Sequence, residues 1–399
     1  MFISQRSLHV PTSPIRKLAP IANRVQAAGR KIYHLNIGQP DITTPEGFYK
    51  GINSFRPRVL AYGNSQGYEP LLKAIQKYYK DWNIDFDLDD IYITNGGSEA
   101  LAFAVETTCD PGDNVLMFEP FYANYKSFTG AYSVEINGVP TSVEDGYHLP
   151  DAATIEKHIN SRTRAIILSN PGNPTGVIYT REEMDMLAKL VLKYDLALIS
   201  DEAYREFVYD GEYTSFAMLP ELNDNVVIID SVSKRYSACG ARIGCIITRN
   251  KALQQEIYKC CQARLTCPSI EQAGAAGLYT TPHSYWAEVR EEYTKRRDTI
   301  KEALAQMPGV QSSDPKGAFY VMVKMPVDDM ENFAKWLLED FSIDNETVMI
   351  TPGNGFYASD MSRGKDECRL AYILNCDDLK KAMHILAEGL KQYPGRTDK

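Results

Sequence analysis

Short apolar segments recur through the middle of the chain, and stretches with helical periodicity follow several of them. Amphipathic patterns at residues 98–107 and 181–194 predict two of these helices. The apolar segments lack clean polar alternation, so they predict strands buried on both faces of a mainly parallel sheet. Alternating strands and helices of this kind predict an α/β domain. The predicted strands span residues 91–94, 114–118, 165–168, 196–199 and 226–229.

The last third of the chain has a different pattern. A long charged helix is predicted over residues 285–304, and an amphipathic helix over residues 378–393. Residues 317–323 and 369–374 read as strands. These elements predict a smaller α+β unit. We expect the first forty or so residues to form no sheet of their own and to pack on this unit.

Length and charge limit the classes of protein that this chain can represent. Its 399 residues suffice for two globular regions, and we expect a large domain over residues 46–284. Residues 1–45 together with 285–399 are expected to form the small domain. A net charge of −9 disfavours a nucleic-acid surface. No apolar run reaches membrane-spanning length, so neither nucleic acid nor a membrane is expected as a partner.

Cysteine and histidine usage indicates the compartment and argues against a metal. The eight cysteines are scattered without a C-x-x-C pair, and the six histidines have no metal-ligand spacing. The first residues lack the basic start and apolar core of a signal peptide. We expect reduced thiols, a cytoplasmic location and no bound metal.

The most unusual charges of the chain lie between residues 231 and 242. Lys234 is flanked by Ser231 and Ser233, and the whole segment separates two apolar runs. Lysine is rarely buried unless it is paired or reactive. A desolvated lysine near a cation becomes a nucleophile toward carbonyls, and Arg242 can supply that cation or bind an anion. Taken alone, the pattern fits a pair of surface charges on a loop equally well.

A second candidate site lies at residues 95–100, directly after a predicted strand. Its glycines permit a tight turn, and the helix that begins there adds partial positive charge to exposed backbone N–H groups. Gly97 and Ser98 therefore predict an anion site. A plain helix start with Ser98 as its cap is the alternative.

Residues 170–176 contain two Asn-Pro steps after another predicted strand. Such steps favour a rigid turn, and we expect at least one cis peptide, foremost Asn173–Pro174. The amide of Asn173 can both donate and accept a hydrogen bond. A surface turn without a ligand is the alternative.

Three further polar or aromatic side chains follow predicted strands. Asp201 ends a buried strand, so its carboxylate needs a cation or several donors, and helix capping is the alternative. Tyr204 and Tyr122 can contact a flat ring, although a lone aromatic is more often core. In open α/β sheets, ligands bind beyond the carboxyl ends of strands, which is where these residues are predicted.

Together these groups match pyridoxal 5′-phosphate. Its phosphate requires an anion cradle and Arg242, its pyridine nitrogen requires Asp201, and its aldehyde requires Lys234. At this point the chain resembles the fold type I aminotransferases of class I/II, nearly end to end. The matching motifs are residues 36–41, 62–63, 97–99, 170–176, 201–204, 231–244 and Arg369.

The resemblance implies an aspartate aminotransferase-like α/β fold. Its large domain has a mainly parallel seven-stranded sheet flanked by helices, beside a smaller α+β domain. It also implies a homodimer with shared active sites, in which Tyr62 reaches the phosphate of the other subunit.

The resemblance also implies the role of each site residue. Lys234 binds the cofactor aldehyde and acts as general base, Asp201 keeps the ring nitrogen protonated, and Arg369 binds the substrate α-carboxylate. Gly38 and Asn173 assist Arg369, and the remaining residues contact the cofactor. Asn173 and Tyr204 contact the ring hydroxyl, and Tyr204 is counted with Lys234 and Asp201 among the catalytic residues. Tyr122 lies on the ring face, Gly97, Ser98, Ser231 and Arg242 hold the phosphate, and Glu99 and Ser233 are further cofactor-binding residues.

The implied reaction moves an amino group between an L-amino acid and a 2-oxo acid in two half-reactions. Aspartate with 2-oxoglutarate is the favoured pair, while aromatic or alanine transamination and carbon–sulfur β-elimination stay open. A non-enzymatic effector domain is disfavoured, because the 35 residues before Asn36 are too few for a DNA-binding unit. For a distal substrate carboxylate, Arg264 and Arg16 are the candidate partners. Each also fits a solvated surface arginine.

Overall fold

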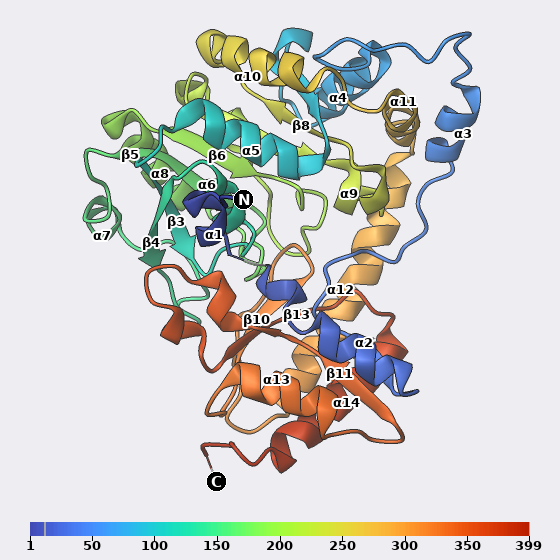
Figure 1. Ribbon diagram of the computed structural model, residues 1–399, viewed down its shortest axis with the longest axis vertical. Coiled ribbons are helices and arrows are strands. Elements are labelled where there is room, and N and C mark those ends of the chain that lie inside the picture. Colours follow the sequence, from blue (N-terminus) through green and yellow to red (C-terminus); the bar gives the residue numbers. More distant parts are fainter. Residues whose placement is uncertain (12, 399) are drawn as a thin grey trace.

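A computed structural model describes residues 1–11 and 13–398. Its largest sheet has seven strands in the order β2-β8-β7-β6-β5-β3-β4 (Figure 1). The five strands from β7 to β4 run parallel, and β8 is antiparallel to both of its neighbours. The predicted mainly parallel sheet is therefore confirmed. In sheet order, its strands are Ile91–Thr94, Gly244–Ile247, Val226–Ser231, Ala197–Asp201, Thr163–Ser169, Asn114–Glu119 and Glu135–Pro140.

Both faces of this sheet are buried. Along β7, Val226 and Ile228 pack into one apolar cluster, and Val227 and Ile229 pack into another on the opposite face. The first cluster includes side chains of α4, α8 and α11, and the second includes those of α5 and α10. Burial on both sides explains why these strands show no polar alternation. The helices are α4 Glu69–Asp81, α5 Gly96–Thr108, α6 Tyr125–Ala131, α8 Arg181–Tyr194, α10 Lys251–Arg264 and α11 Ser269–Leu278.

A second, smaller unit lies below the large sheet in Figure 1 and has its own core. Its four-stranded antiparallel sheet has the order β12-β13-β10-β9. Three helices pack with it, of which α12 also reaches the large domain through Trp286. The elements are β9 Gln311–Ser312, β10 Tyr320–Lys324, β12 Thr351–Pro352, β13 Glu367–Ala371, α12 His283–Ala305, α13 Met330–Glu339 and α14 Cys376–Gln392.

The N-terminal residues form no sheet by themselves and pack on the smaller unit, but they also add a strand to it. Strand β1, Lys31–His34, pairs in parallel with β11, Glu346–Met349. Helix α2, Ala19–Ala27, precedes β1, and Leu18 and Ile32 lie in the core of the smaller unit. Sequence patterns hide β1 because it is only four residues long and its partner lies more than 300 residues away.

Strand β4 was also missed, because a glycine and a proline interrupt its apolar residues.

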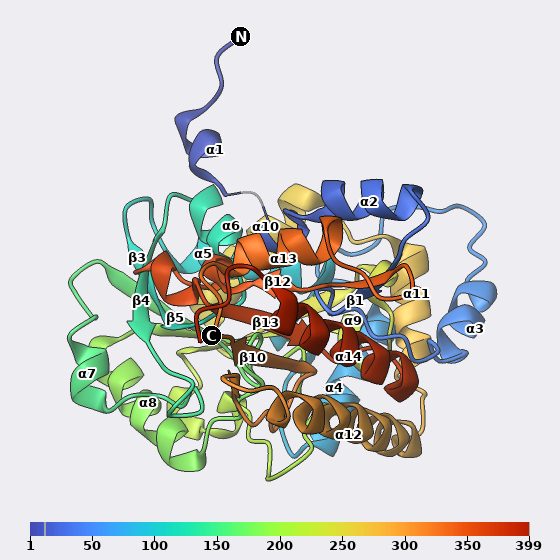
Figure 2. The same cartoon turned by 90° about the horizontal axis from the view of Figure 1, so that it is seen from below.

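Figure 2 shows α1 projecting from the body of the molecule. Across residues 1–11 and 13–398, no helix is both long enough and apolar enough to cross a membrane. The remaining short elements are α1 Gln5–His9, η1 Pro14–Arg16, α3 Gly47–Ser54, η2 Leu88–Asp90, α7 Ala152–Glu156, η3 Phe216–Met218, η4 Pro220–Leu222, α9 Val232–Arg235, η5 Cys239–Ala241, η6 Gly353–Phe356 and η7 Met361–Gly364.

A reciprocal cap at the start of α8 yields a stability prediction. The Thr180 hydroxyl accepts from the Glu183 backbone N–H at 3.2 Å, and the Glu183 carboxylate accepts from that of Thr180 at 2.7 Å. We expect Thr180→Ala to lower the free energy of unfolding by about 1 kcal/mol in urea titrations. Lys189→Ala, an exposed change on the same helix, should stay within about 0.5 kcal/mol of wild type. Equal effects would contradict the cap's contribution.

Candidate active site

A cavity of about 760 Å³ lies where the carboxyl ends of strands in the large sheet meet the smaller unit. Residues from far-apart parts of the chain line it, including most of those singled out from the sequence. The sequence-predicted residues in its lining are Arg16, Gly38, Gly97, Ser98, Tyr122, Asn173, Asp201, Tyr204, Ser231, Ser233, Lys234, Arg242 and Arg369.

Lys234 enters the cavity from α9, a single helical turn directly after β7. Its Nζ donates to the Gly38 carbonyl at 2.7 Å and lies 3.8 Å from the Cys239 thiol. The Ser231 hydroxyl caps this turn by accepting from the Ser233 backbone N–H at 3.1 Å. The amine of Lys234 is therefore held at one side of the cavity without a carboxylate partner among the described residues.

Glycines shape the anion cradle at the start of α5. A Cβ on Gly96 would lie 2.3 Å from an Arg242 nitrogen, and Gly96 has a φ of +70°. A Cβ on Gly244 would lie 2.5 Å from the backbone of Gly96. Only glycine at these two positions lets β8 and Arg242 approach the helix N-terminus so closely. Gly97 and Ser98 at the helix N-terminus line the cavity together with Arg242, a combination of backbone N–H groups and a guanidinium that suits a phosphate.

Asp201 ends β6 and is buried. Its carboxylate accepts from the Tyr125 hydroxyl at 2.9 Å and from the Ala203 backbone N–H at 3.2 Å. Burial nevertheless raises the pKa of Asp201 to about 6. No lysine or arginine pairs with it in the described chain, so a ligand cation at this position would stabilise its charged form.

Asn173 connects two functional groups. Its amide donates to the Tyr204 hydroxyl at 3.2 Å, and its carbonyl oxygen accepts from Arg369 at 3.0 Å. The peptide bonds before Pro171 and Pro174 are both cis, which confirms the expectation for this turn. Asn173 thus joins the part of the cavity near Tyr204 to the part near Arg369.

Arg369 lies on β13 and is 1 % exposed. It donates to the Asn36 carbonyl at 2.7 Å, and its guanidinium carbon lies 4.4 Å from the centre of the Tyr320 ring. No carboxylate pairs with it among residues 1–11 and 13–398, and its Nε has no hydrogen-bond partner there. A buried arginine without an acidic partner suits the carboxylate of a substrate.

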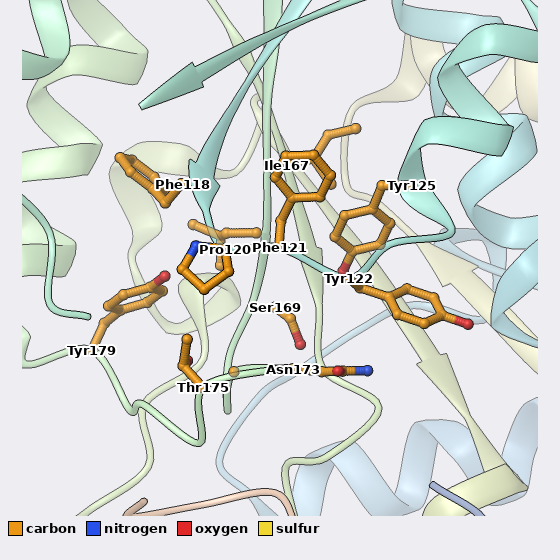
Figure 3. Close-up of a pocket in the computed structure, with 12 residues that line it drawn as sticks. Phe118, Pro120, Phe121, Tyr122, Tyr125, Ile167, Ser169, Asn173, Thr175 and Tyr179 are labelled. Atoms are coloured by element: carbon orange, nitrogen blue, oxygen red, sulfur yellow. The ribbon is translucent and has the colours of Figure 1, made fainter. Parts of the chain in front are cut away.

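A small pocket of about 20 Å³ shares lining residues with the main cavity, and Figure 3 shows the residues that line it. Tyr122 and Asn173 line both, while Tyr125 and Ser169 line only the smaller one. Sequence reasoning missed Tyr125, although it lies three residues after Tyr122 on the same turn. It also missed Tyr320, whose hydroxyl lies 3.0 Å from that of Tyr204.

Three predicted residues lie outside this cavity. The Glu99 carboxylate accepts from the Asn95 backbone N–H at 2.8 Å and lies 3.4 Å from Arg264. Glu99 and Arg264 therefore form an ion pair with each other, and neither lines the cavity of its own chain. Tyr62 is 81 % exposed on the loop between α3 and α4. Its contribution to a second subunit stays a prediction.

Arg16 reaches the cavity from η1, beside α2. Within the part of the chain that the structure describes, its guanidinium has neither a hydrogen bond nor an ion pair. Arg16 is therefore a cavity-lining cation that has no partner among the described residues and is not matched to any group of the cofactor.

The chain belongs to the aminotransferase class I and II family, whose model matches residues 30–386. It is 29% identical to an aspartate aminotransferase of Bacillus subtilis, over 98% of this chain and all of that one. It is equally identical to an arginine–pyruvate transaminase of Pseudomonas aeruginosa, over 90% of each chain. An alanine aminotransferase structure from Pyrococcus furiosus superposes with a TM-score of 0.90 at 29% identity, over 98% of this chain and all of that one.

The protein is therefore a fold type I transaminase, and its family depends on pyridoxal phosphate. The residues in the cavity fit that cofactor. The glycine turn leaves room where a Cβ would clash, and buried Asp201 lacks a cation in the described chain. The Lys234 amine lines the same cavity and has no carboxylate partner among the described residues.

The raised pKa of Asp201 yields a prediction for the cofactor-free protein. Its pKa lies near 6 in the fold, above the ordinary 3.8, so stability should fall as the pH rises through that window. We expect the wild type to lose about 1 kcal/mol between about pH 5 and pH 7, relative to Asp201→Asn. Urea unfolding at both pH values measures this difference. Glu182→Gln, an exposed control, should keep the wild-type slope, and a wild-type slope in Asp201→Asn would contradict the prediction.

Proposed function

We propose that this transaminase prefers acidic substrates, with aspartate and 2-oxoglutarate as the foremost pair. One observation carries the proposal. Arg16 is a cation of the cavity lining with no partner among the described residues. A second carboxylate on the substrate would meet it, because guanidinium and carboxylate groups match in charge and geometry.

The charges of the cavity support this assignment. Lys234, Arg242 and Arg369 suit the cofactor aldehyde, its phosphate and the substrate α-carboxylate, and Asp201 is the carboxylate of the lining. An alanine or aromatic side chain would leave Arg16 without a partner. The names of the relatives give no single substrate, since they include aspartate, alanine and arginine.

When bound, pyridoxal phosphate supplies an electron sink that makes the substrate Cα–H acidic. The protein contributes orientation and charge. Arg369 fixes the α-carboxylate, Asn173 fixes Arg369, and Lys234 removes the Cα proton at its Nζ as general base. The charged form of Asp201 keeps the ring nitrogen protonated.

Other groups in the lining hold the cofactor in place. Tyr122 would cover one face of the ring and exclude water, and Tyr204, which accepts from the Asn173 amide, would donate to the ring oxygen. Gly97, Ser98, Ser231, Ser233 and Arg242 line the part of the cavity that would hold the phosphate. Glu99 would stabilise the start of helix α5, because its carboxylate accepts from the Asn95 backbone N–H.

The proposal includes a homodimer with shared sites. The loop between α3 and α4 exposes the apolar side chains of Val59, Leu60 and Tyr62. Leu265 and Ile270, which follow α10 in the sequence, are also exposed. A partner that covers this surface would receive Tyr62, and Arg264 lies close to the same loop through its contact with the Ser65 carbonyl. Carbon–sulfur β-elimination remains the second candidate, and release of pyruvate and ammonia from cystathionine would identify it.

Two coarser expectations accompany the proposed function. Eight free cysteines support a reducing compartment such as the cytoplasm. The separate apolar cores support a large domain over residues 46–284 and a small domain over residues 1–45 and 285–399.

The role of Lys234 gives the first test. Lys234→Ala should lower turnover by about 10⁴-fold, because it removes both the cofactor attachment and the general base. Borohydride reduction followed by peptide mapping should find cofactor on Lys234 in the wild type and none in the variant. Lys189→Ala, on exposed α8 surface, should keep both properties. Full activity of Lys234→Ala would overturn the assignment.

The role of Arg16 gives the second test. Arg16→Met should raise the KM for aspartate and 2-oxoglutarate by about 10- to 100-fold, because a charged hydrogen bond is lost. The KM for alanine should change by less than about twofold. Arg369→Ala is the contrasting variant and should raise the KM of every amino acid. Equal effects of Arg16→Met on aspartate and alanine would remove Arg16 from substrate recognition.

A further inference from the structure

A fully buried ion pair encloses the segment that carries Lys234. Asp230 is the penultimate residue of β7, and Arg235 is the last residue of α9. The Arg235 Nη2 lies 2.8 Å and 2.6 Å from the two carboxylate oxygens of Asp230. Both side chains are 1 % exposed. The ion pair therefore joins the two ends of the turn formed by residues 231–234.

Helix α4 holds this ion pair from outside the turn. The Tyr79 hydroxyl donates to Asp230 at 2.9 Å, and the Arg235 guanidinium carbon lies 4.0 Å from the centre of the Tyr78 ring. The Ser231 backbone N–H donates to Asp230 at 2.7 Å. The position of the turn is thus tied to a helix that packs on the face of the sheet opposite α5.

The ion pair does not touch the cavity. Side chains alternate along a strand, so Ser231 lines the cavity while Asp230 points to the α4 side. In α9, Ser233 and Lys234 line the cavity, and Arg235 does not. Neither member of the pair can contact the cofactor or substrate directly.

Stability alone gives no reason to keep charges here. Removing two ions from water is costly, and apolar residues of similar volume often stabilise a core as well or better. A four-residue helix also cannot hold itself, because the first turn is unfavourable without tertiary contacts. The Asp230–Arg235 ion pair can hold the backbone of residues 231–235 in one position, because its hydrogen bonds require defined directions and apolar contacts do not.

We propose that Asp230 and Arg235 are positioning residues for Lys234, an inference that rests on the role of Lys234 in the proposed function. They fix Ser231, Ser233 and Lys234 as one rigid unit relative to the sheet. Misplacing a reacting group by about 1 Å can cost about 100-fold in rate. Weakening the pair should therefore affect the Lys234 amine more than substrate binding, because Arg369 and Arg16 lie on other elements.

The test compares Arg235→Lys and Asp230→Asn with wild-type holoenzyme. Arg235→Lys keeps the charge but loses the planar fork. Arg297→Lys is the matched control, because Arg297 is also buried and pairs with Asp210 at 2.6 Å away from the cavity. Measurements are kcat, KM, the pH titration of the visible absorbance of bound cofactor, and hydrogen exchange at residues 231–236 without cofactor.

For Arg235→Lys and Asp230→Asn, kcat should fall by about 10- to 100-fold, with KM changed by less than about threefold. The absorbance titration should shift its midpoint, and exchange at residues 231–236 should accelerate. Arg297→Lys should show none of these changes, even at equal loss of thermal stability. Wild-type values of kcat and of the titration in both pair variants would overturn the inference.

A double variant separates positioning from simple stability. Asp230→Leu with Arg235→Met replaces the ion pair by apolar side chains, and its thermal stability should recover toward wild type. We expect kcat to remain at least about 10-fold low, because the directional bonds are absent. Recovery of kcat together with stability would overturn the positioning role.

The proposed function and the positioning role of Asp230 and Arg235 can fail separately. If borohydride reduction of the wild-type holoenzyme labels no Lys234, the proposed function fails and the positioning role fails with it. If the wild type is labelled while the pair variants match it in kcat and in the absorbance titration, only the role of Asp230 and Arg235 fails.

Discussion

Parallel strands place their carboxyl ends at one edge of the sheet, and the site depends on that constraint. Asn173 follows β5, Asp201 ends β6 and Lys234 follows β7, and these residues are about 30 positions apart along the chain. Adjacent strands lie only about 5 Å apart, so these side chains converge without any long loop. The smaller unit then closes the cavity and supplies Arg369 from β13.

Charge in the cavity is sparse, and each group lacks an opposite partner in the described chain that would neutralise it. Asp201 is buried with hydrogen-bond donors but no cation, and Arg369 is buried against an aromatic ring and carbonyl groups. Charged groups held in this way cost folding free energy. A ligand with a cationic ring nitrogen and a carboxylate recovers that free energy on binding.

Contacts on the α4 face of the large sheet hold the turn that carries Lys234. The Asp230–Arg235 pair is inaccessible to solvent, while Lys234 on the same turn faces the cavity. A short turn therefore has a fixed base and a reactive side. Tyr78 and Tyr79 connect that base to α4, so the position of Lys234 depends on packing that no ligand touches.

The sequence alone determined the two-unit α/β fold and most of the cavity-lining residues singled out for the cofactor, because buried strands and glycine turns leave local patterns. Lys234, Asp201 and Asn173 were singled out from residue type and position after predicted strands, and Arg369 from the resemblance to the family. Tertiary structure decided the rest. The β1–β11 pairing, the contact of Tyr125 with Asp201 and the pairing of Glu99 with Arg264 are set by packing and by charge neutralisation between segments, and no local pattern records them.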